Sequence, residues 1–298
     1  MSDPIILAVD AGGTSLKAAL AGEDGGLLPG CFFRQEVNSD RTAEEIAASY
    51  RALARKARQE ARSRSAEITA VSVCIPGPFQ YRDGVCLMRH KYAAIYGIPM
   101  RPWFEEGLGA QIPIHFLHDS TAFLLGAAGS LERNRYKRIC GAIIGTGLGF
   151  ASMFDGKIYE NPQGGPGISI FSRPFRDSIA EDYVSKRAVE REYQMLCPGE
   201  PLPTVEEIAS MAREGHEIPL RIFQDLGTAL GEILRDICAE NRFELLLLGG
   251  AISKSADLFI PALRKAMAGP WIPEIRQTGN LDSAPLLGAA QAALLNQE

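Results

Sequence analysis

The sequence predicts an α/β protein with two lobes, and three observations support this. Its 298 residues exceed one small domain and suit one or two domains with a well-buried core. Short apolar runs that read as strands alternate with apolar stripes at helical spacing. Residues 8–14 and 143–149 each read as a strand that enters a glycine turn, and this short pseudo-repeat indicates a duplicated design.

Individual elements follow from local patterns. Thr42-Ala43-Glu44-Glu45 is a capping box that predicts the start of a long helix. Asp119 lies where a strand meets a small-residue helix, and we expect the positive end of that helix to face its carboxylate. The expected strands are 5–9, 16–20, 68–75, 112–117, 139–144, 150–154 and 245–248, and the expected helices begin at 42, 122, 220, 258 and 285.

Composition and charge exclude several classes of protein. An apolar fraction of 46% is that of an ordinary globular chain and argues against disorder. A formal net charge of -5 provides no global field that would attract nucleic acid or an anionic membrane. No signal-length apolar stretch follows Met1, and no run reaches about 18 apolar residues. We therefore expect a cytoplasmic protein with neither a nucleic-acid nor a membrane partner.

The six cysteines argue for free thiols. They form no Cys-x-x-Cys pair and have no neighbouring His at zinc-finger spacing. Cys74 and Cys140 lie inside apolar strand-like runs, as buried free thiols do. We therefore expect a reducing compartment and no structural zinc.

Three glycine turns each follow an apolar strand. They are the first glycine turn (10–14), the second (145–149) and the third (Gly249-Gly250). Any one alone is more often a tight turn between strands. Glycine, however, lets the backbone approach a polyphosphate and point its N–H groups at the oxygens, and Thr14 and Thr146 add hydroxyl donors. Taken together, the three turns favour a nucleotide site.

Asp10 strengthens this interpretation, because a hairpin needs no acid at that position whereas a Mg-nucleotide needs a carboxylate. Two common nucleotide motifs fail on spacing. Gly156-Lys157 continues into Ile158, so there is no P-loop. The second glycine turn reads Gly-x-Gly-x-Gly and precedes a strand, so it does not match the dinucleotide fingerprint.

As a set, these motifs resemble the ROK group of sugar kinases and regulators. The resemblance spans nearly the whole chain and is carried by Asp10-Ala11-Gly12-Gly13-Thr14 with Lys17, Pro76-Gly77-Pro78, Asp119, Gly145-Thr146-Gly147-Leu148-Gly149, Leu248-Gly249-Gly250 and Leu286-Leu287-Gly288-Ala289-Ala290. It implies a bilobal actin/hexokinase/Hsp70-like ATPase fold of duplicated ribonuclease H-like domains, with ATP between the lobes. With a boundary near residue 117 inferred from the repeat, the N-terminal lobe is 1–116 plus 285–298 and the C-terminal lobe is 117–284. Residues 181–185 also resemble a helical segment of the family.

The resemblance implies roles for individual residues. Asp119 matches the general base that accepts a proton from a sugar hydroxyl, with ATP and Mg2+ as cofactors; the residue by itself would equally suit a helix N-cap. Asp10 is implied to hold Mg2+, through water. The implied ATP-binding residues are Asp10, Gly12, Gly13, Thr14, Lys17, Gly145, Thr146, Gly147, Gly249 and Gly250. The implied sugar-binding residues are Gly77, His90, Lys91, His118, Asp119, Gly164 and Gly165.

The sequence also departs from the family pattern. His118 stands where the family usually has Asn, and residues 164–171 lack both the Glu and His that contact sugar and the zinc-binding cysteines. We therefore expect no zinc and altered sugar contacts, with His90, Lys91 and His118 as candidate replacements. For His90 and Lys91, an ordinary surface loop explains the residues equally well.

These observations predict an ATP-dependent kinase of a hexose or amino sugar. Two alternatives share the fold: a sugar-responsive regulator or other non-catalytic sugar-binding protein, and an ATPase or phosphohydrolase that transfers to water. We expect no N-terminal helix-turn-helix, because the first strand begins at once. A homodimer is expected by analogy alone.

Overall fold

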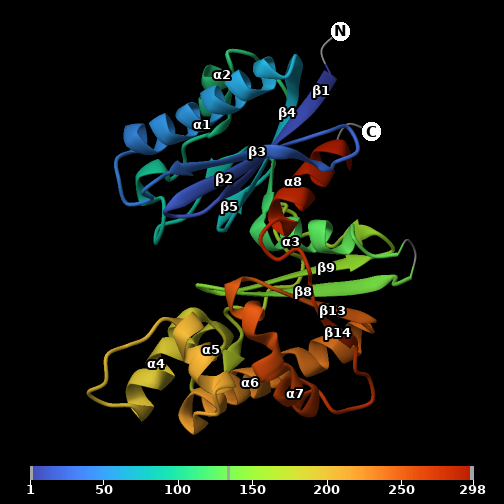
Figure 1. Cartoon of the computed structure of the whole chain (residues 1–298). Coiled ribbons are helices and arrows are strands. Elements are labelled where there is room, and N and C mark those ends of the chain that lie inside the picture. Colours follow the sequence, from blue (N-terminus) through green and yellow to red (C-terminus); the bar gives the residue numbers. More distant parts are fainter. Residues whose placement is uncertain (1–2, 133–134, 296–298) are drawn as a thin grey trace. The chain divides into compact units, whose positions relative to one another are not determined.

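The computed structural model describes residues 3–132 and 135–295 (Figure 1). The chain divides into two compact units. Unit 1 comprises Met1–Ser130, Glu160–Pro166 and Ser283–Glu298, and unit 2 comprises Leu131–Tyr159 and Gly167–Asp282. This division differs from the expected boundary near residue 117, because the strand and helix around that residue both pack onto elements of unit 1.

Unit 1 is built on a five-stranded sheet. In spatial order its strands are β3 (Leu27–Glu36), β2 (Ser15–Ala21), β1 (Asp3–Ala11), β4 (Ala66–Ile75) and β7 (Ile114–His118). β2 is antiparallel to both of its neighbours, β3 and β1, whereas β1, β4 and β7 run parallel. The predicted hairpin around the first glycine turn is therefore confirmed.

Unit 2 repeats this topology. Its strands lie in the order β10 (Lys157–Ile158), β9 (Leu148–Phe154), β8 (Arg138–Ile144), β13 (Leu245–Gly249) and β14 (Glu274–Gln277). Again the second strand is antiparallel to both of its neighbours, and the last three run parallel. The order 3-2-1-4-5 and the strand directions thus agree between the units, which confirms the duplicated design that the pseudo-repeat predicts.

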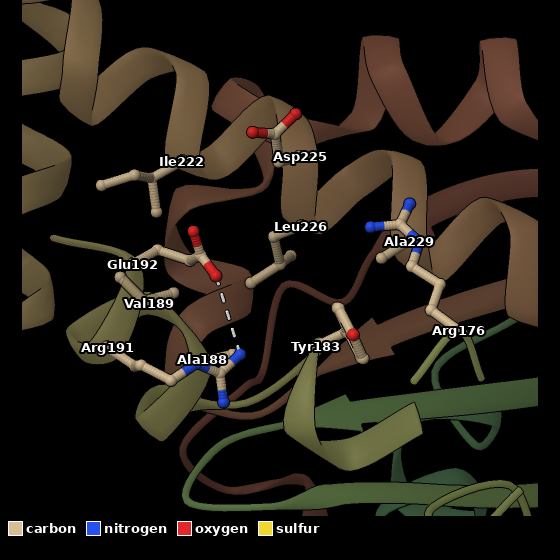
Figure 2. A pocket seen from close by; sticks show the side chains of 10 residues that line it. All are labelled: Arg176, Tyr183, Ala188, Val189, Arg191, Glu192, Ile222, Asp225, Leu226 and Ala229. Carbon is tan, nitrogen blue, oxygen red and sulfur yellow. Dashed lines mark ion pairs between the residues drawn. The ribbon is translucent and has the colours of Figure 1, made fainter. Parts of the chain in front are cut away.

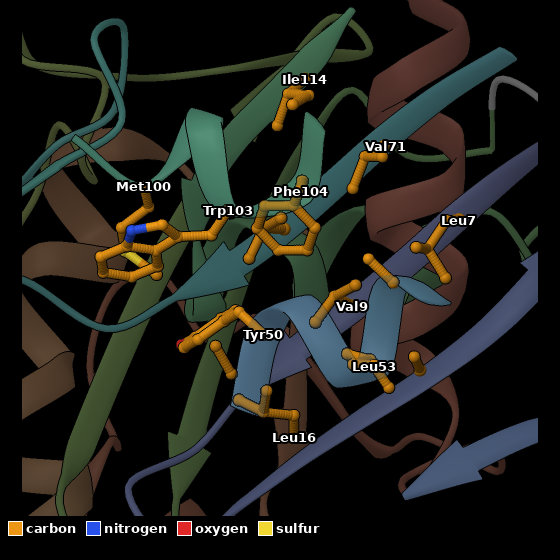
Figure 3. Close-up of a cluster of buried hydrophobic side chains, with 14 of the residues drawn as sticks. Leu7, Val9, Leu16, Tyr50, Leu53, Val71, Met100, Trp103, Phe104 and Ile114 are labelled. Carbon is orange, nitrogen blue, oxygen red and sulfur yellow. The ribbon is translucent and has the colours of Figure 1, made fainter. Parts of the chain in front are cut away.

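One face of the unit 1 sheet is covered by α1 (Ala43–Ser63) and α2 (Arg101–Leu108). The predicted capping box starts α1: Thr42 N–H donates to Glu45 Oε2 at 3.0 Å, and Glu45 N–H donates to Thr42 Oγ1 at 3.3 Å. Figure 3 shows the core beneath these helices, where Tyr50 lies against the strands with Trp103 and Phe104. Burial of such large apolar side chains stabilises this unit.

The opposite face of the same sheet is lined by small side chains. Side chains alternate along a strand, so Ala8 of β1 and Ala70 of β4 face away from α1. The helix that covers this face, α8 (Ala284–Leu295), is itself rich in Ala and Gly. Small residues on both partners let the helix lie close to the sheet.

The helix α3 (Asp119–Ala128) crosses α8 at a pair of glycines. A Cβ on Gly288 would lie 1.7 Å from the carbonyl oxygen of Ala122, and one on Gly126 would lie 2.0 Å from that of Ala284. The two helix backbones are therefore in direct contact. Because α3 begins at Asp119, this crossing sets the position of that carboxylate within unit 1.

Helices cover the sheet of unit 2 as well. The predicted stripe becomes α6 (Glu217–Asn241), which packs on α7 (Ala256–Ala266), α5 (Val205–Arg213) and α4 (Lys186–Leu196). The segment 181–185 is not the expected helix. It contains the end of a 3-10 turn, Ala180–Asp182, and Ser185 caps α4 by accepting from Ala188 N–H at 3.3 Å.

The remaining elements are short, and sequence patterns did not indicate them. They are the strands β5 (Phe79–Gln80), β6 (Val85–Cys86), β11 (Pro174–Phe175) and β12 (Ser178–Ile179) and the 3-10 turns Ala93–Ile95 and Ala251–Ser255. All six cysteines are free thiols. Among the described residues, no helix combines the length and apolar character needed to cross a membrane.

Replacing Gly288 with Ala is expected to lower the unfolding free energy of the chain by at least about 2 kcal/mol, because the new methyl group must push α3 and α8 apart. Urea denaturation followed by circular dichroism measures this. Gly279→Ala is the matched control, since a Cβ there meets no atom within 4 Å. Equal midpoints for the two variants would show that the crossing is not closely packed.

Candidate functional site

Two carboxylates lie at the same edge of the unit 1 sheet. Asp10, near the end of β1, is in register with Cys74 of the parallel strand β4, and Cys74 is in register with Leu117 of β7. Asp119 follows β7 directly and begins α3. Parallel strands end at a common edge, where open α/β sheets bind ligands. The two acids that the motifs singled out are therefore neighbours.

Burial raises the pKa of Asp10 above its ordinary value. The ammonium of Lys17, its register partner in β2, opposes this shift, whereas the charge of Asp119 adds to it. The Cys74 thiol donates to Asp10 Oδ1 at 3.7 Å. Asp10 is thus a carboxylate whose charge is costly in the free protein and which a bound cation would stabilise.

Asp119 has the opposite character. Its Oδ1 accepts from the backbone N–H of Ser120 at 2.7 Å and lies 2.8 Å from Nδ1 of His118. Enclosure by the protein acts to raise the pKa of Asp119, but His118, the Ser120 N–H and the charge of Lys91 outweigh it and hold the pKa below its usual range. Its side chain is 46% exposed. Asp119 is therefore an ionised, accessible proton acceptor at neutral pH.

The helix α3 begins earlier than expected, at Asp119 rather than at residue 122. The N-cap is His118, whose Nδ1 lies 3.1 Å from Ser120 N and 2.7 Å from Ser120 Oγ. An N-cap role for Asp119 is therefore not what the structure shows. Its place in the first turn also puts its negative charge at the positive end of the helix.

Four of the predicted sugar-binding residues gather around a residue that the motifs did not indicate. A Cβ on Gly77 would lie 3.3 Å from the hydroxyl of Tyr81 and 3.7 Å from the His118 ring. Gly164 and Gly165 pack on the same tyrosine; a Cβ built on Gly164 would lie 3.1 Å from it. The rings of Tyr81 and His118 are 6.0 Å apart in an edge-on arrangement. Tyr81 thus brings these segments together.

Nothing in the local sequence could have identified Tyr81, since its role arises from contacts far along the chain. Its hydroxyl donates to the carbonyl of Ile75 at 3.2 Å, and its N–H donates to the carbonyl of Gln163 at 3.3 Å. Lys91 lies beside Gly13 of the first glycine turn, at 3.8 Å from a Cβ built there. His90 is exposed, and no contact among the described residues ties it to this group.

Unit 2 holds the other two glycine turns. A Cβ on Gly250, whose φ is +83°, would lie 2.3 Å from the carbonyl oxygen of Ile144. Ile144 directly precedes the second glycine turn, so the third turn packs against the start of the second. Thr146 is exposed at the tip of the second turn. The structure therefore brings these two turns together, as a shared phosphate or nucleotide contact requires.

Glu181 braces the second glycine turn. Its Oε2 accepts from Leu148 N–H at 3.0 Å, and its Oε1 accepts from Arg187 at 2.7 Å. A Cβ on Gly147 would lie 2.3 Å from that same Oε2. Only glycine allows the carboxylate so close, which explains one glycine of the motif by packing. The sequence indicated residue 181 only as part of a helical segment.

The carboxylates of unit 1 fit a magnesium ion that a nucleotide carries. Among the described residues, no three His, Cys, Asp or Glu side chains cluster as they would in an all-protein metal site. Mg2+ commonly takes one or two protein carboxylates and completes its shell with water and substrate phosphates. Asp10, half-buried and with a raised pKa, has the character of such a ligand.

Each unit also contains a pocket. A hollow of about 310 Å³ in unit 1 borders Thr14 of the first glycine turn, together with Arg34, Asn38 and Arg41. A pocket of about 180 Å³ in unit 2 lies between α4 and α6 and contains no predicted site residue (Figure 2). Its charged groups pair with acids nearby, as in Arg191–Glu192 at 3.7 Å and Arg176–Glu232 at 3.0 Å.

Comparison with known proteins identifies the family. A model described as the ROK family matches residues 6–169, more than half of the chain. The chain belongs to the ROK family. The match includes the first two glycine turns and Asp119. The resemblance that the motifs indicate is therefore confirmed.

The chain is similar both to sugar kinases and to a transcriptional repressor. An N-acetyl-D-glucosamine kinase of Pectobacterium atrosepticum is 26% identical, covering 76% of this chain and 81% of the kinase. The solved structure of a ROK family glucokinase from Streptomyces griseus in complex with glucose and AMPPNP superposes with a TM-score of 0.76 at 20% identity. The match covers 99% of this chain and 100% of the glucokinase chain. The DNA-binding transcriptional repressor Mlc of Escherichia coli is 20% identical, covering 72% of this chain and 57% of the repressor. The fold is the actin/hexokinase-like one.

Replacing Asp10 with Asn is expected to raise the melting temperature at pH 7. Because the pKa of Asp10 is higher in the folded protein than in the unfolded one, its ionised form destabilises the folded state above that pKa, and protonation on acidification removes the penalty. The advantage of the variant should therefore shrink as the pH falls toward 4.5. Calorimetry at the two pH values tests this, and a variant that melts lower than wild type at both would contradict it.

Proposed function

We propose that this chain transfers the γ-phosphoryl group of ATP to a hydroxyl of a hexose or amino sugar, with Asp119 as the general base. The observation that supports this most is the state of Asp119. It is an ionised, half-exposed carboxylate, held by the Ser120 N–H and His118 at the start of α3. In a ROK-family chain with an actin/hexokinase-like fold, such a group suits the activation of an alcohol.

In the proposed reaction the sugar hydroxyl oxygen attacks the γ-phosphorus. The new O–P bond forms as the bond to the leaving ADP breaks, and the hydroxyl proton passes to the Asp119 carboxylate. Such a base must lie within about 2.6–3.2 Å of the hydroxyl oxygen. The lowered pKa of Asp119 keeps it ready to accept the proton throughout the neutral range.

The glycine turns are proposed to hold the phosphates. In the first turn, Gly13 and the exposed Thr14 present backbone N–H groups and a hydroxyl, whereas the Gly12 N–H donates to the Ser15 carbonyl at 3.1 Å and shapes the turn. Lys17 lies beside Asp10. In unit 2, Thr146 is exposed on the second turn next to the third. Mg2+ held by Asp10, directly or through water, would neutralise phosphate charge. The AMPPNP bound by the similar glucokinase supports ATP as the donor.

The acceptor is proposed to lie against His118 and Asp119, whose side chains are accessible. The similar kinases act on N-acetyl-D-glucosamine and glucose, which supports a hexose or amino sugar here. Gly77, Gly164 and Gly165 pack on Tyr81, whose side chain lies 3.3, 3.1 and 3.6 Å, respectively, from a Cβ built on each of them. Tyr81 is itself buried and contacts the His118 ring, so we propose that it positions His118, which offers the sugar a polar atom in place of the family's usual contacts.

Release of ADP, measured with Mg-ATP in the presence and absence of a sugar panel, tests the proposal. Release that depends on a sugar supports the kinase. Release without sugar would instead show a phosphohydrolase. The similarity to the repressor Mlc makes a non-catalytic sugar-binding protein the second candidate. Sugar binding in calorimetry without any ADP release would decide for it.

Replacing Asp119 with Asn is expected to lower kcat by a factor of about 10²–10⁴, because the amide cannot accept the proton. Its oxygen can still accept from Ser120 N–H, so AMPPNP affinity should stay near wild type. The melting temperature should fall moderately, because the lowered pKa of Asp119 means that its charge stabilises the folded state at neutral pH. Asp257→Asn is the control for turnover, since Asp257 lies in the first turn of α7; because it pairs with Arg213 at 2.8 Å, its melting temperature is not compared. Near-wild-type turnover in Asp119→Asn would remove this residue from the mechanism.

Replacing His118 with Ala is expected to raise the KM for the sugar by about fivefold or more, the effect of losing one hydrogen bond of about 1 kcal/mol. Steady-state kinetics with the preferred sugar measures it. His216→Ala serves as the control, because His216 also occupies a helix N-cap but makes no side-chain capping bond. An unchanged KM in His118→Ala would place the sugar elsewhere.

A further inference from the structure

We infer that Lys91 is a catalytic residue whose ammonium group binds the oxygens of the phosphoryl group during transfer, rather than binding the sugar. This inference rests on the proposed phosphoryl transfer and deepens it. Three features carry it: the anchoring of the backbone at Tyr92, the path of the Lys91 side chain along Gly13, and the distribution of charge at this edge of the sheet.

The backbone next to Lys91 is fixed to the first glycine turn. Tyr92 is fully buried, and its hydroxyl donates to the carbonyl of Gly12 at 2.5 Å while accepting from the hydroxyl of Tyr50 at 3.3 Å. Burial raises the pKa of Tyr92 to about 12, so the hydroxyl remains a donor at any physiological pH. A chain of hydrogen bonds thus runs from α1 through Tyr92 into the turn.

Tyr92 adopts an unfavourable backbone conformation while it makes this hydrogen bond to the first glycine turn. Its φ is +54°, in the left-handed region that non-glycine residues rarely adopt. Such a conformation costs of order 1–3 kcal/mol and persists only where the surroundings enforce it, most often at functional sites. This backbone geometry places Lys91 against the first glycine turn.

The side chain of Lys91 follows Gly13. Its Cδ and Cε atoms each lie 3.8 Å from a Cβ built on Gly13, so the stem packs on the turn and only the ammonium extends beyond it. Its charge reaches Asp119, where it helps to lower the pKa of that carboxyl group. Within residues 3–132 and 135–295, Lys91 forms no ion pair within 4.0 Å. The ammonium is therefore available between the turn and the base.

Negative charge accumulates at this edge of the sheet, and the Lys91 ammonium can offset it. Asp10 and Asp119 are close enough for the charge of one to raise the pKa of the other, and an incoming phosphoryl group would add further negative charge. Lys17 is already opposite Asp10 in the hairpin. Phosphoryl transfer depends on positive groups placed where charge develops. Lys91 supplies one beside the acid that takes the proton.

Lys91→Met keeps the length of the side chain and removes its charge, so kinetics with this variant tests the inference. We expect kcat to fall by a factor of about 10²–10³, with the KM for the sugar within about twofold of wild type. Lys91→Arg should recover part of the loss. Lys265→Met, at an exposed site on α7, is the control. A raised sugar KM with unchanged kcat would show instead that Lys91 binds the acceptor.

A binding measurement that needs no turnover separates this inference from the proposed function. Calorimetry should show that Lys91→Met loses about tenfold in affinity for Mg-AMPPNP and little for Mg-ADP, because only the former carries the γ-phosphoryl group. Equal affinity changes for both nucleotides would overturn the role of Lys91. If wild type releases no ADP with any sugar, the proposed function fails, and the ratio of the two affinities still decides whether Lys91 contacts the γ-phosphoryl group.

Discussion

The contact of α3 with α8 at Gly126 and Gly288 is the constraint on which the unit 1 site depends. The backbones touch there, so α3 can neither slide nor tilt without a clash at Ala122 or Ala284. The N-terminus of α3 carries Asp119, and α8 in turn lies on the small-residue face of β1 and β4. The position of the proposed base is therefore fixed by the packing of a helix pair on a sheet.

The same sheet edge gives two acids opposite properties. Burial raises the pKa of Asp10, whereas His118, Ser120 N–H and Lys91 lower that of Asp119 despite its enclosure. Pairs of titratable groups whose environments push their pKa values apart commonly divide the roles of a reaction between them. For this chain we propose cation binding by Asp10 and proton acceptance by Asp119. Lys91, whose charge helps to lower the pKa of Asp119, is proposed to offset part of the negative charge there.

Local patterns predicted much of the fold but only part of the site. The hairpin around Asp10, the Thr42 capping box and the duplicated sheets follow from strand, turn and cap chemistry that short segments encode. Tyr81, Tyr92 and Glu181 act through partners far along the chain, so no local signal indicates them. For the same reason residues 181–185 do not form the expected helix. Glu181 accepts a hydrogen bond from Leu148 N–H in the second glycine turn, and Ser185 caps α4.

A crystal structure with AMPPNP and the sugar that stimulates ADP release most tests the central claim directly, because it shows what the Asp119 carboxylate contacts. We expect one sugar hydroxyl oxygen within about 2.6–3.2 Å of an Asp119 oxygen, with the sugar next to His118. A bound sugar whose hydroxyls all lie out of reach of Asp119 would contradict it.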